Sequence, residues 1–257
     1  MRLFSLTFLG TGTSQGVPVV GCPCDVCQSL DNKDQRLRSS VLIQSEGAQV
    51  VIDCGPDFRQ QMLREGVKRV DSIVLTHEHM DHVAGLDDVR PFNFMMKQDM
   101  PVFATERVQN RLKQQFAYAF AANKYPGSPG YELRTVVENQ AFQIADQTWM
   151  PILGQHGTWP IMGYRIGDLV YLTDISGMKL EQIDYIKGAK ILIVNALRRT
   201  KHVAHFNLEE AIEFAISTEV EQVYLTHASH HLGTHQGISE ELPSHIKLAY
   251  DGLKLTF

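Results

Sequence analysis

The stretch Thr76-His77-Glu78-His79-Met80-Asp81-His82 decides how the whole chain is interpreted. It places three histidines and one aspartate directly after the apolar run Ser72–Leu75, which is typical of the end of a buried strand. Each buried imidazole or carboxylate would need its own partner, so such a cluster is costly to keep for structural reasons alone. Neutral imidazoles and carboxylates are ligands that zinc, manganese and iron accept. The stretch therefore predicts a metal site.

The spacing within this stretch favours two ions over one. On an extended loop, His77 and His79 point to the same side and can share one ion. We expect the chain to bend and a helix to open at 83–86, so that Asp81 and His82 face a second ion. The alternative, histidines exposed on a polar loop, fits poorly with so dense a cluster.

Composition describes an ordinary globular protein. The 257 residues suffice for one large domain or two small ones, and the chain is 44% hydrophobic and 21% charged. No apolar run approaches the ~20 residues of a membrane span, and the first residues are too short an apolar segment for a secretory signal, so we expect a cytoplasmic protein without a membrane partner. The formal net charge of −5 argues against a nucleic-acid partner, although a local basic patch could still bind one.

A second candidate metal site lies near the N-terminus. Cys22, Cys24 and Cys27 have C-x-C-x-x-C spacing, which lets three thiolates close around one tetrahedral ion if another segment supplies a fourth ligand. The alternative is three unrelated buried cysteines. Disulfides are not expected in a reducing cytoplasm. We expect Cys54 to be a small buried residue and not a ligand.

Several predicted strands end in a residue that can bind metal. The apolar runs at 49–52, 150–155, 169–172 and 223–226 each look like a strand. Side chains at strand ends tend to meet at one edge of a sheet, and a metal centre needs such a rigid support. We therefore expect one site to include the residues that follow these runs: Asp53, His156, Asp174 and His227.

Other segments have simpler interpretations. We expect hairpins at 40–52 and 163–172, a strand at 3–9, a strand at 101–104 followed by a helix from 105 or 106, and a helix over 58–66. The aromatic segment 116–131 is either core or a lid over a pocket. The substrate preference is expected to depend on the variable region 86–140.

His205 precedes a predicted helix at 208–218. Asn207 and Glu210 form a capping-box pattern at its start. A histidine just ahead of a helix N-terminus lies where phosphate oxygens are favourably placed, so a functional interpretation is preferred for His205. His202 is expected to be a surface residue.

Taken in order, the candidate residues resemble the five-part signature of the metallo-β-lactamase superfamily: Asp53, His77-x-His79-x-Asp81-His82, His156, Asp174 and His227. The resemblance spans nearly the whole chain. It implies a single α/β domain over residues 1–257, folded as a four-layer αββα sandwich with the metals at one edge of the two sheets.

Three features resemble the phosphoribosyl 1,2-cyclic phosphate phosphodiesterases of phosphonate (carbon–phosphorus lyase) metabolism. They are the segment GTGTSQGVPVVGCPCDVC at 10–27, the T-H-x-x-H element at 226–230, and His205 placed 22 positions before His227. This resemblance implies that His230 is the fourth ligand of a structural zinc held by loop 22–27, with Cys22, Cys24 and Cys27.

The same resemblance implies a dinuclear centre. One ion would be bound by His77, His79 and His156, the other by Asp81, His82 and His227, with Asp174 bridging and Asp53 orienting a ligand. Two divalent ions, zinc or manganese or iron, ~4 Å apart would supply hydroxide to attack a small, cyclic phosphodiester. His205 would donate a proton to the leaving group or hold a phosphate oxygen.

Three other functions share this fold and stay open. They are a transfer-RNA 3′-processing endonuclease, a carboxylic or thiol ester hydrolase, and a non-catalytic accessory protein of cofactor biosynthesis. The metal signature alone does not separate them; the cysteine site and His205 favour the phosphodiesterase. A homodimer is the default expectation for an enzyme of this kind.

Overall fold

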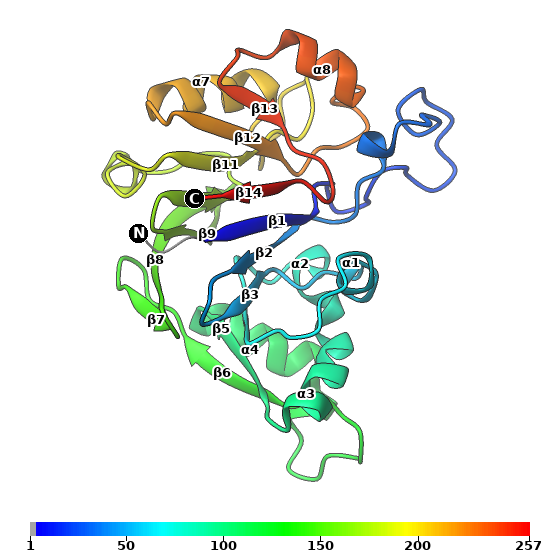
Figure 1. Cartoon of the computed structure of the whole chain (residues 1–257), viewed down its shortest axis with the longest axis vertical. Coiled ribbons are helices and arrows are strands. Elements are labelled where there is room, and N and C mark those ends of the chain that lie inside the picture. The colour runs from blue at the N-terminus through cyan, green and yellow to red at the C-terminus, as the bar shows by residue number, and fades with distance from the viewer. Residues whose placement is uncertain (1–3) are drawn as a thin grey trace.

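The computed structural model describes residues 4–257 and contains two seven-stranded sheets (Figure 1). The first sheet has the order β14 (Lys254–Thr256), β1 (Ser5–Gly10), β2 (Ser40–Gln44), β3 (Gln49–Ile52), β4 (Ser72–Val74), β5 (Met100–Ala104) and β6 (Tyr131–Thr135). The second has the order β13 (Ile246–Leu248), β12 (Gln222–Thr226), β11 (Ile191–Asn195), β10 (Leu169–Leu172), β9 (Trp159–Ile166), β8 (Gln147–His156) and β7 (Phe142–Ile144).

Helices cover the outer face of each sheet. The first sheet carries α1 (Phe58–Arg64), α2 (Met80–Val83), the 3₁₀ helix η2 (Ala84–Val89), α3 (Arg90–Met96), α4 (Glu106–Gln115) and α5 (Ala117–Phe120). The second carries α6 (Leu180–Ile183), α7 (Leu208–Ser217) and α8 (His235–Glu241), while a short 3₁₀ helix, η1 (Asn32–Asp34), lies in the N-terminal loop. The predicted four-layer αββα sandwich is confirmed.

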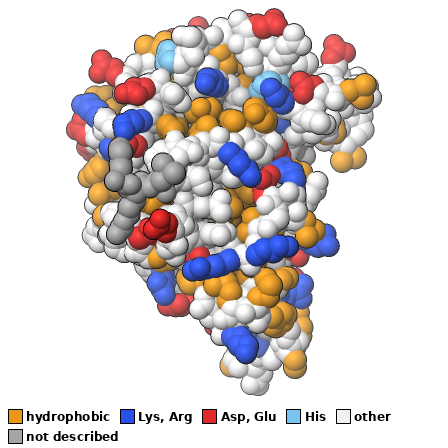
Figure 2. Space-filling view, in the orientation of Figure 1, with side chains coloured by type: hydrophobic (Ala, Val, Ile, Leu, Met, Phe, Trp, Pro, Cys, Tyr) orange, Lys and Arg blue, Asp and Glu red, His pale blue; other side chains and the backbone are white. Residues whose placement is uncertain are grey.

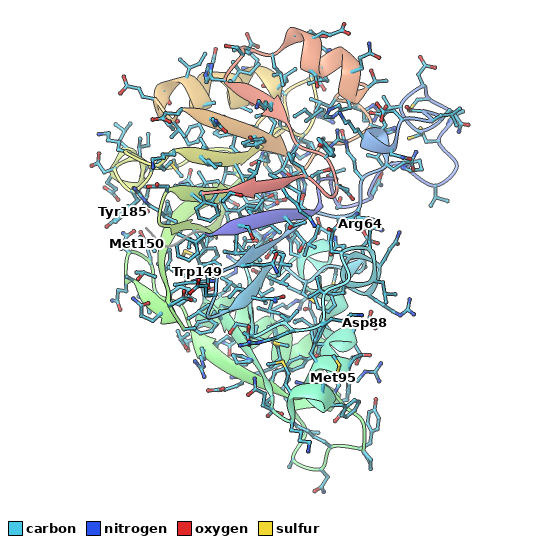
Figure 3. The ribbon with its side chains drawn as sticks, viewed as in Figure 1. Arg64, Asp88, Met95, Trp149, Met150 and Tyr185 are labelled. Carbon is cyan, nitrogen blue, oxygen red and sulfur yellow. The ribbon has the colours of Figure 1, made fainter. Side chains whose placement is uncertain are left out.

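The core between the sheets follows from strand alternation. Along β1, Leu6 and Phe8 point inward between the sheets, whereas Leu9 joins the cluster beneath the helices. Trp149, labelled in Figure 3, and Tyr164 lie fully buried in the same inter-sheet layer. Each large apolar side chain buried in this way contributes roughly 1.5–3 kcal/mol. Both sheets are therefore held as one rigid support.

Parallel pairing brings the carboxyl ends of the site-bearing strands together. β3 and β4 are parallel in the first sheet, and β10, β11, β12 and β13 are parallel in the second. The residues that follow β3, β4, β10 and β12 are thus delivered to one edge of the sandwich, as the sequence predicted.

Most predicted elements are confirmed, with shifted boundaries. The hairpins are β2–β3 and β9–β10, and the strand expected at 3–9 is β1, although Leu3 lies outside the described residues. The helix after the histidine cluster starts at Met80 and not at Val83, because the chain leaves its extended conformation at His79 (ψ 148°). Asp81 and His82 therefore lie in the first turn of α2.

Two features of the surface bear on partners. Within residues 4–257, no helix combines the length and apolar character of a membrane span. On the face shown in Figure 2, Lys and Arg side chains are spread over the surface among neutral, hydrophobic and acidic side chains.

Candidate metal centres

Three residues at the sheet edge adopt a left-handed backbone conformation. Asp53, Asp174 and His227, which follow β3, β10 and β12, have φ angles of 64°, 61° and 56°. Such a conformation costs a non-glycine residue of order 1–3 kcal/mol and persists only where the surrounding structure enforces it. Their repetition at the ends of three strands makes this edge a candidate functional site.

The first candidate ion site consists of His77, His79 and His156, whose ring nitrogens lie within 4.8 Å of one another. The Nδ1 atom of His156 lies 2.8 Å from the carbonyl oxygens of both Asp174 and Ala204. These contacts fix the ring and leave Nε2 for another group. The Nε2 atom of His77 is buried and has no hydrogen-bond partner among residues 4–257. Such an orphaned nitrogen fits a metal ligand.

Asp53 contacts one candidate ligand directly and a second through Thr76. Its buried carboxylate lies 2.7 Å from Nδ1 of His82 and accepts hydrogen bonds from the amide and hydroxyl of Thr76. The Thr76 hydroxyl is in turn 2.9 Å from Nδ1 of His77. Asp53 therefore orients His82 directly and His77 through Thr76, and in both rings it turns Nε2 toward the centre.

The second candidate ion site consists of Asp81, His82, Asp174 and His227. The Nε2 atom of His82 lies 3.2 Å from Asp81 and 3.3 Å from Asp174, and Nε2 of His227 lies 3.0 Å from Asp174. Ligands ~2.0–2.1 Å from one tetrahedral zinc are about 3.3 Å apart, so these spacings fit a common ion. Asp174 also groups with His156 and His205, so it lies between the two sites, where a bridging carboxylate is expected and where His205 also offers a ligand atom.

Burial and charge set the protonation of these groups. Burial holds the pKa of His77 well below its usual value, so this imidazole is neutral and can donate its lone pair. For His227 burial works in the same direction, but Asp174 and Asp81 outweigh it and raise the pKa to about 9. Burial opposes ionisation of Asp174 as well, yet His227 and His82 bring its pKa well below the usual range. Asp174 is thus ionised opposite protonated histidines, and a divalent cation would take the place of their protons.

His205 lies beside both groups. Its ring centre is 4.5 Å from that of His156 and 5.0 Å from that of His227, and its Nδ1 lies 3.7 Å from Asp174 Oδ1. Burial lowers the pKa of His205 to about 3, so the ring is neutral. The capping box predicted at Asn207 and Glu210 is present, and Asn207, the N-cap of α7, lies two positions after His205.

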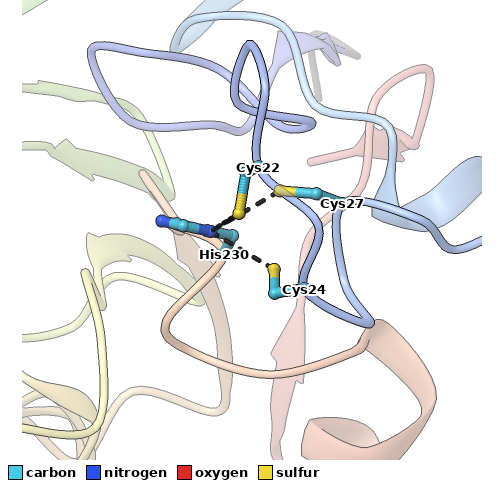
Figure 4. A group of neighbouring side chains, drawn as sticks. All are labelled: Cys22, Cys24, Cys27 and His230. Carbon is cyan, nitrogen blue, oxygen red and sulfur yellow. Dashed lines mark hydrogen bonds between the residues drawn. The ribbon is translucent and has the colours of Figure 1, made fainter.

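The cysteine cluster forms a separate site (Figure 4). Nδ1 of His230 lies 3.2, 3.4 and 3.5 Å from the sulfurs of Cys22, Cys24 and Cys27. For sulfur at ~2.3 Å and nitrogen at ~2.0 Å from one tetrahedral zinc, the separation is about 3.5 Å. The amide of Cys27 and the ring of His230 lower the pKa of Cys24 to about 6, which favours its thiolate. This donor set and geometry fit one zinc ion.

Comparison with known proteins agrees with the geometry. The family model for the beta-lactamase superfamily domain matches residues 48–228. A solved structure described as a new diphosphatase from the PhnP family is 41% identical, with a TM-score of 0.93, and the match covers 100% of this chain and 98% of that one. The chain belongs to the PhnP family of metallo-β-lactamase hydrolases. The resemblance inferred from the sequence is confirmed at this level.

Two further relatives extend the comparison. A Porphyromonas gingivalis protein named octanoyltransferase is 43% identical over 248 residues, which is 96% of this chain but 50% of that protein, so the PhnP-family chain spans about half the length of this curated relative. The Zn²⁺-bound PqqB from Methylobacterium extorquens shares the fold, with 18% identity, a TM-score of 0.78, and coverage of 98% of this chain and 99% of that one.

Three residues that support the candidate sites in this PhnP-family chain were not identified from the sequence. Asn195, the last residue of β11, accepts a hydrogen bond from the amide of Ile175 (2.7 Å) and donates one to its carbonyl (3.0 Å), so it holds the loop that carries Asp174. The sequence signal that could have identified Asn195 is a polar residue at the end of an apolar strand. Thr76 and Trp159 were also missed, because their contacts depend on tertiary placement.

Proposed function

We propose that this PhnP-family protein is a dinuclear-metal-dependent phosphohydrolase that cleaves a small phosphodiester. The observation that supports this most is the pair of adjacent ligand groups with Asp174 between them. His205 lies beside the same carboxylate, where it can reach a bound phosphoryl group. A diphosphate linkage presents the same type of phosphorus centre, which agrees with the name of the similar diphosphatase.

The proposed ligands divide between two ions. His77, His79 and His156 would hold one, and Asp81, His82 and His227 the other, with Asp174 shared. Zinc, manganese and iron all suit this donor set. Two such ions would lower the pKa of a coordinated water and neutralise negative charge on the phosphoryl oxygens. The chain itself contributes ligand orientation, through Asp53, Thr76 and the His156 contacts.

His205 is proposed to act on the substrate and not to bind metal. The neutral ring can donate a hydrogen bond to a phosphoryl oxygen or to the departing oxygen. Its neighbours His156 and His227 are themselves held by the sheet, so the position of His205 relative to a bound phosphate is defined.

The cysteine cluster is proposed to be a structural zinc site. Three thiolates and one imidazole complete a tetrahedral shell and leave no open position for substrate. Its role would be to secure the N-terminal loop against the segment that follows His227.

The competing functions are less well supported. The octanoyltransferase name belongs to a protein of which this chain matches half, so it does not assign acyl transfer to this chain. A transfer-RNA nuclease needs an extended basic surface, whereas the net charge is −5. A non-catalytic accessory role is disfavoured because every expected ligand position is filled by a residue that can bind metal.

The test is a parallel assay of the purified protein loaded with zinc or manganese. Bis(p-nitrophenyl) phosphate, a lactone and a thioester are compared, and metals are counted on the same sample. We expect the diester to be cleaved far faster than either carbonyl substrate. Preferential cleavage of the lactone or thioester would overturn the proposed substrate class, and full metal occupancy without turnover would favour the accessory role.

A further inference from the structure

An unassigned cluster of three side chains borders the proposed dinuclear site. Glu78 lies between two proposed ligands, Arg107 is on α4, and Trp159 begins β9. Trp159 is 45% exposed, yet its ring centre lies 5.3 Å from that of His79. The cluster thus joins the variable region 86–140 to the metal-binding edge.

The Arg107 guanidinium is held from two directions. Its Nε and Nη2 atoms both lie 2.8 Å from Oε1 of Glu78, and its central carbon lies 4.6 Å from the centre of the Trp159 ring. The side chain of Glu78 is 11% exposed, whereas that of Arg107 is 42% exposed. A mostly buried carboxylate and an aromatic face therefore fix a cation that still reaches solvent.

An ion pair whose cation is 42% exposed stabilises the fold only weakly. The main effect of the contacts with Glu78 and Trp159 is to restrict the rotation of the long Arg107 side chain. The edge of the guanidinium that carries Nε and Nη2 faces Glu78, which leaves the edge with Nη1 for another group. A planar fork fixed in advance is the arrangement that recognises phosphate and carboxylate oxygens well.

The same geometry disfavours an aromatic ring as the ligand of this cluster. One face of Trp159 is covered by the Arg107 guanidinium, and its other close neighbour is the His79 ring. A stacked base would have to displace Arg107 from that face. An anionic oxygen can approach Arg107 without breaking either contact.

We propose that Arg107, positioned by Glu78 and Trp159, forms a subsite for a second phosphate group of the substrate, adjacent to the phosphate bound at the dinuclear centre. The inference rests on the proposed phosphohydrolase function and deepens it. The preferred substrates would be compounds with two phosphates, with the scissile one at the metals and the other at Arg107. Arg107 is then a specificity-determining residue.

The test measures binding, so that it does not depend on turnover. The metal-loaded full chain is titrated calorimetrically with AMP and with α,β-methylene-ADP, which has a second phosphate and a non-hydrolysable bridge. Wild type, Arg107→Ala, Arg107→Lys and Arg111→Ala are compared, and metals are counted after each titration to detect stripping by the ligand. Arg111 is the matched control: it is exposed on the same helix and contacts Gln114.

We expect wild type and Arg111→Ala to bind the diphosphate analogue roughly tenfold or more tightly than AMP. A charged hydrogen bond from Arg107 to the second phosphate strengthens binding by about this factor. Arg107→Ala should abolish this preference while AMP affinity stays within a few-fold, and Arg107→Lys should keep part of it. A wild type without the preference, or an Arg107→Ala variant that retains it, would overturn the subsite. If the preference behaves as expected but wild type hydrolyses no phosphate ester, the proposed function fails and the subsite stands.

Discussion

The two candidate metal sites are built in opposite ways. The dinuclear cluster collects residues from the ends of β3, β4, β8, β10 and β12, on a support whose core is fully buried. The protein itself supports its geometry, with three residues at positive φ and histidines oriented by Asp53, Thr76 and backbone carbonyls. The cysteine cluster lies on a loop, where Cys22 and Cys24 are partly exposed.

This difference predicts different consequences of metal loss. A site held by a rigid sheet should keep its shape when one ligand is removed, so substitutions there should abolish chemistry and spare the fold. A site in which the ligands are held mainly by their ion should lose local order when the ion leaves. Variants in each region can therefore break or sharpen the comparison.

The largest effect is expected for Asp174→Asn. The change keeps the size of the side chain and tolerates the left-handed backbone, but removes the charge shared by both ion sites. Diester hydrolysis should fall about a thousandfold or more, because the ions that stabilise the phosphoryl charge would no longer be held by a shared carboxylate. Steady-state kinetics and metal counting on the same sample measure this. Activity within tenfold of wild type would show that Asp174 does not serve the ions.

His205→Ala should be the next most severe change. Loss of a hydrogen-bond donor to the substrate's transition state costs about 10²- to 10³-fold in rate, while both ions should remain bound. His202→Ala is the matched control, since that ring centre lies 5.1 Å from that of His205. If metal content of His205→Ala falls together with activity, His205 is a ligand and the proposed role is wrong.

Asp53→Asn should weaken metal binding without removing a ligand. The amide keeps a hydrogen-bonding group beside His82 and Thr76 but lacks the carboxylate charge, so metal affinity should fall about 10- to 100-fold. Competition with a chelator measures this, and activity should recover at high metal concentration. A variant whose activity stays low at saturating metal would place Asp53 in the chemistry itself.

Cys24→Ala should have the smallest effect on catalysis. The hydrogen bonds that join Ala228 to Thr11 and Thr13 do not involve sulfur, so His227 should keep its place and turnover should fall less than about tenfold. Limited proteolysis should instead show faster cleavage within 16–35. Cys54→Ala, a buried residue outside the cluster, should keep the zinc ion. A collapse of diester turnover in Cys24→Ala would mean that the two sites are coupled.

The sequence predicted the layered fold and the main clusters because their signals are local or ordered. His77, His79, Asp81 and His82 are adjacent in the chain, and the apolar runs before Asp53, Asp174 and His227 indicate strands by composition alone. Parallel pairing then brings strand ends together by a general rule.

Other features depend on atoms that only the folded chain brings together. The positive φ angles at Asp53, Asp174 and His227 leave no sequence signal, since aspartate and histidine do not require that conformation. The contact between Arg107 and Trp159 joins α4 to β9, two elements with no fixed spacing. The start of α2 at Met80 differs from the helix expected at 83–86 because the bend expected after His79 is itself the first turn of that helix.

Metal counting on three proteins tests the central claim most directly. Wild type, Asp174→Asn and Cys24→Ala would be loaded with zinc, freed of excess metal and analysed for zinc per chain. If the two sites are independent, wild type should bind three ions. Asp174→Asn should lose only ions of the dinuclear pair. Cys24→Ala should lose one ion and keep its diester activity. A wild type that binds a single ion, or a Cys24→Ala variant that loses all three, would contradict the account.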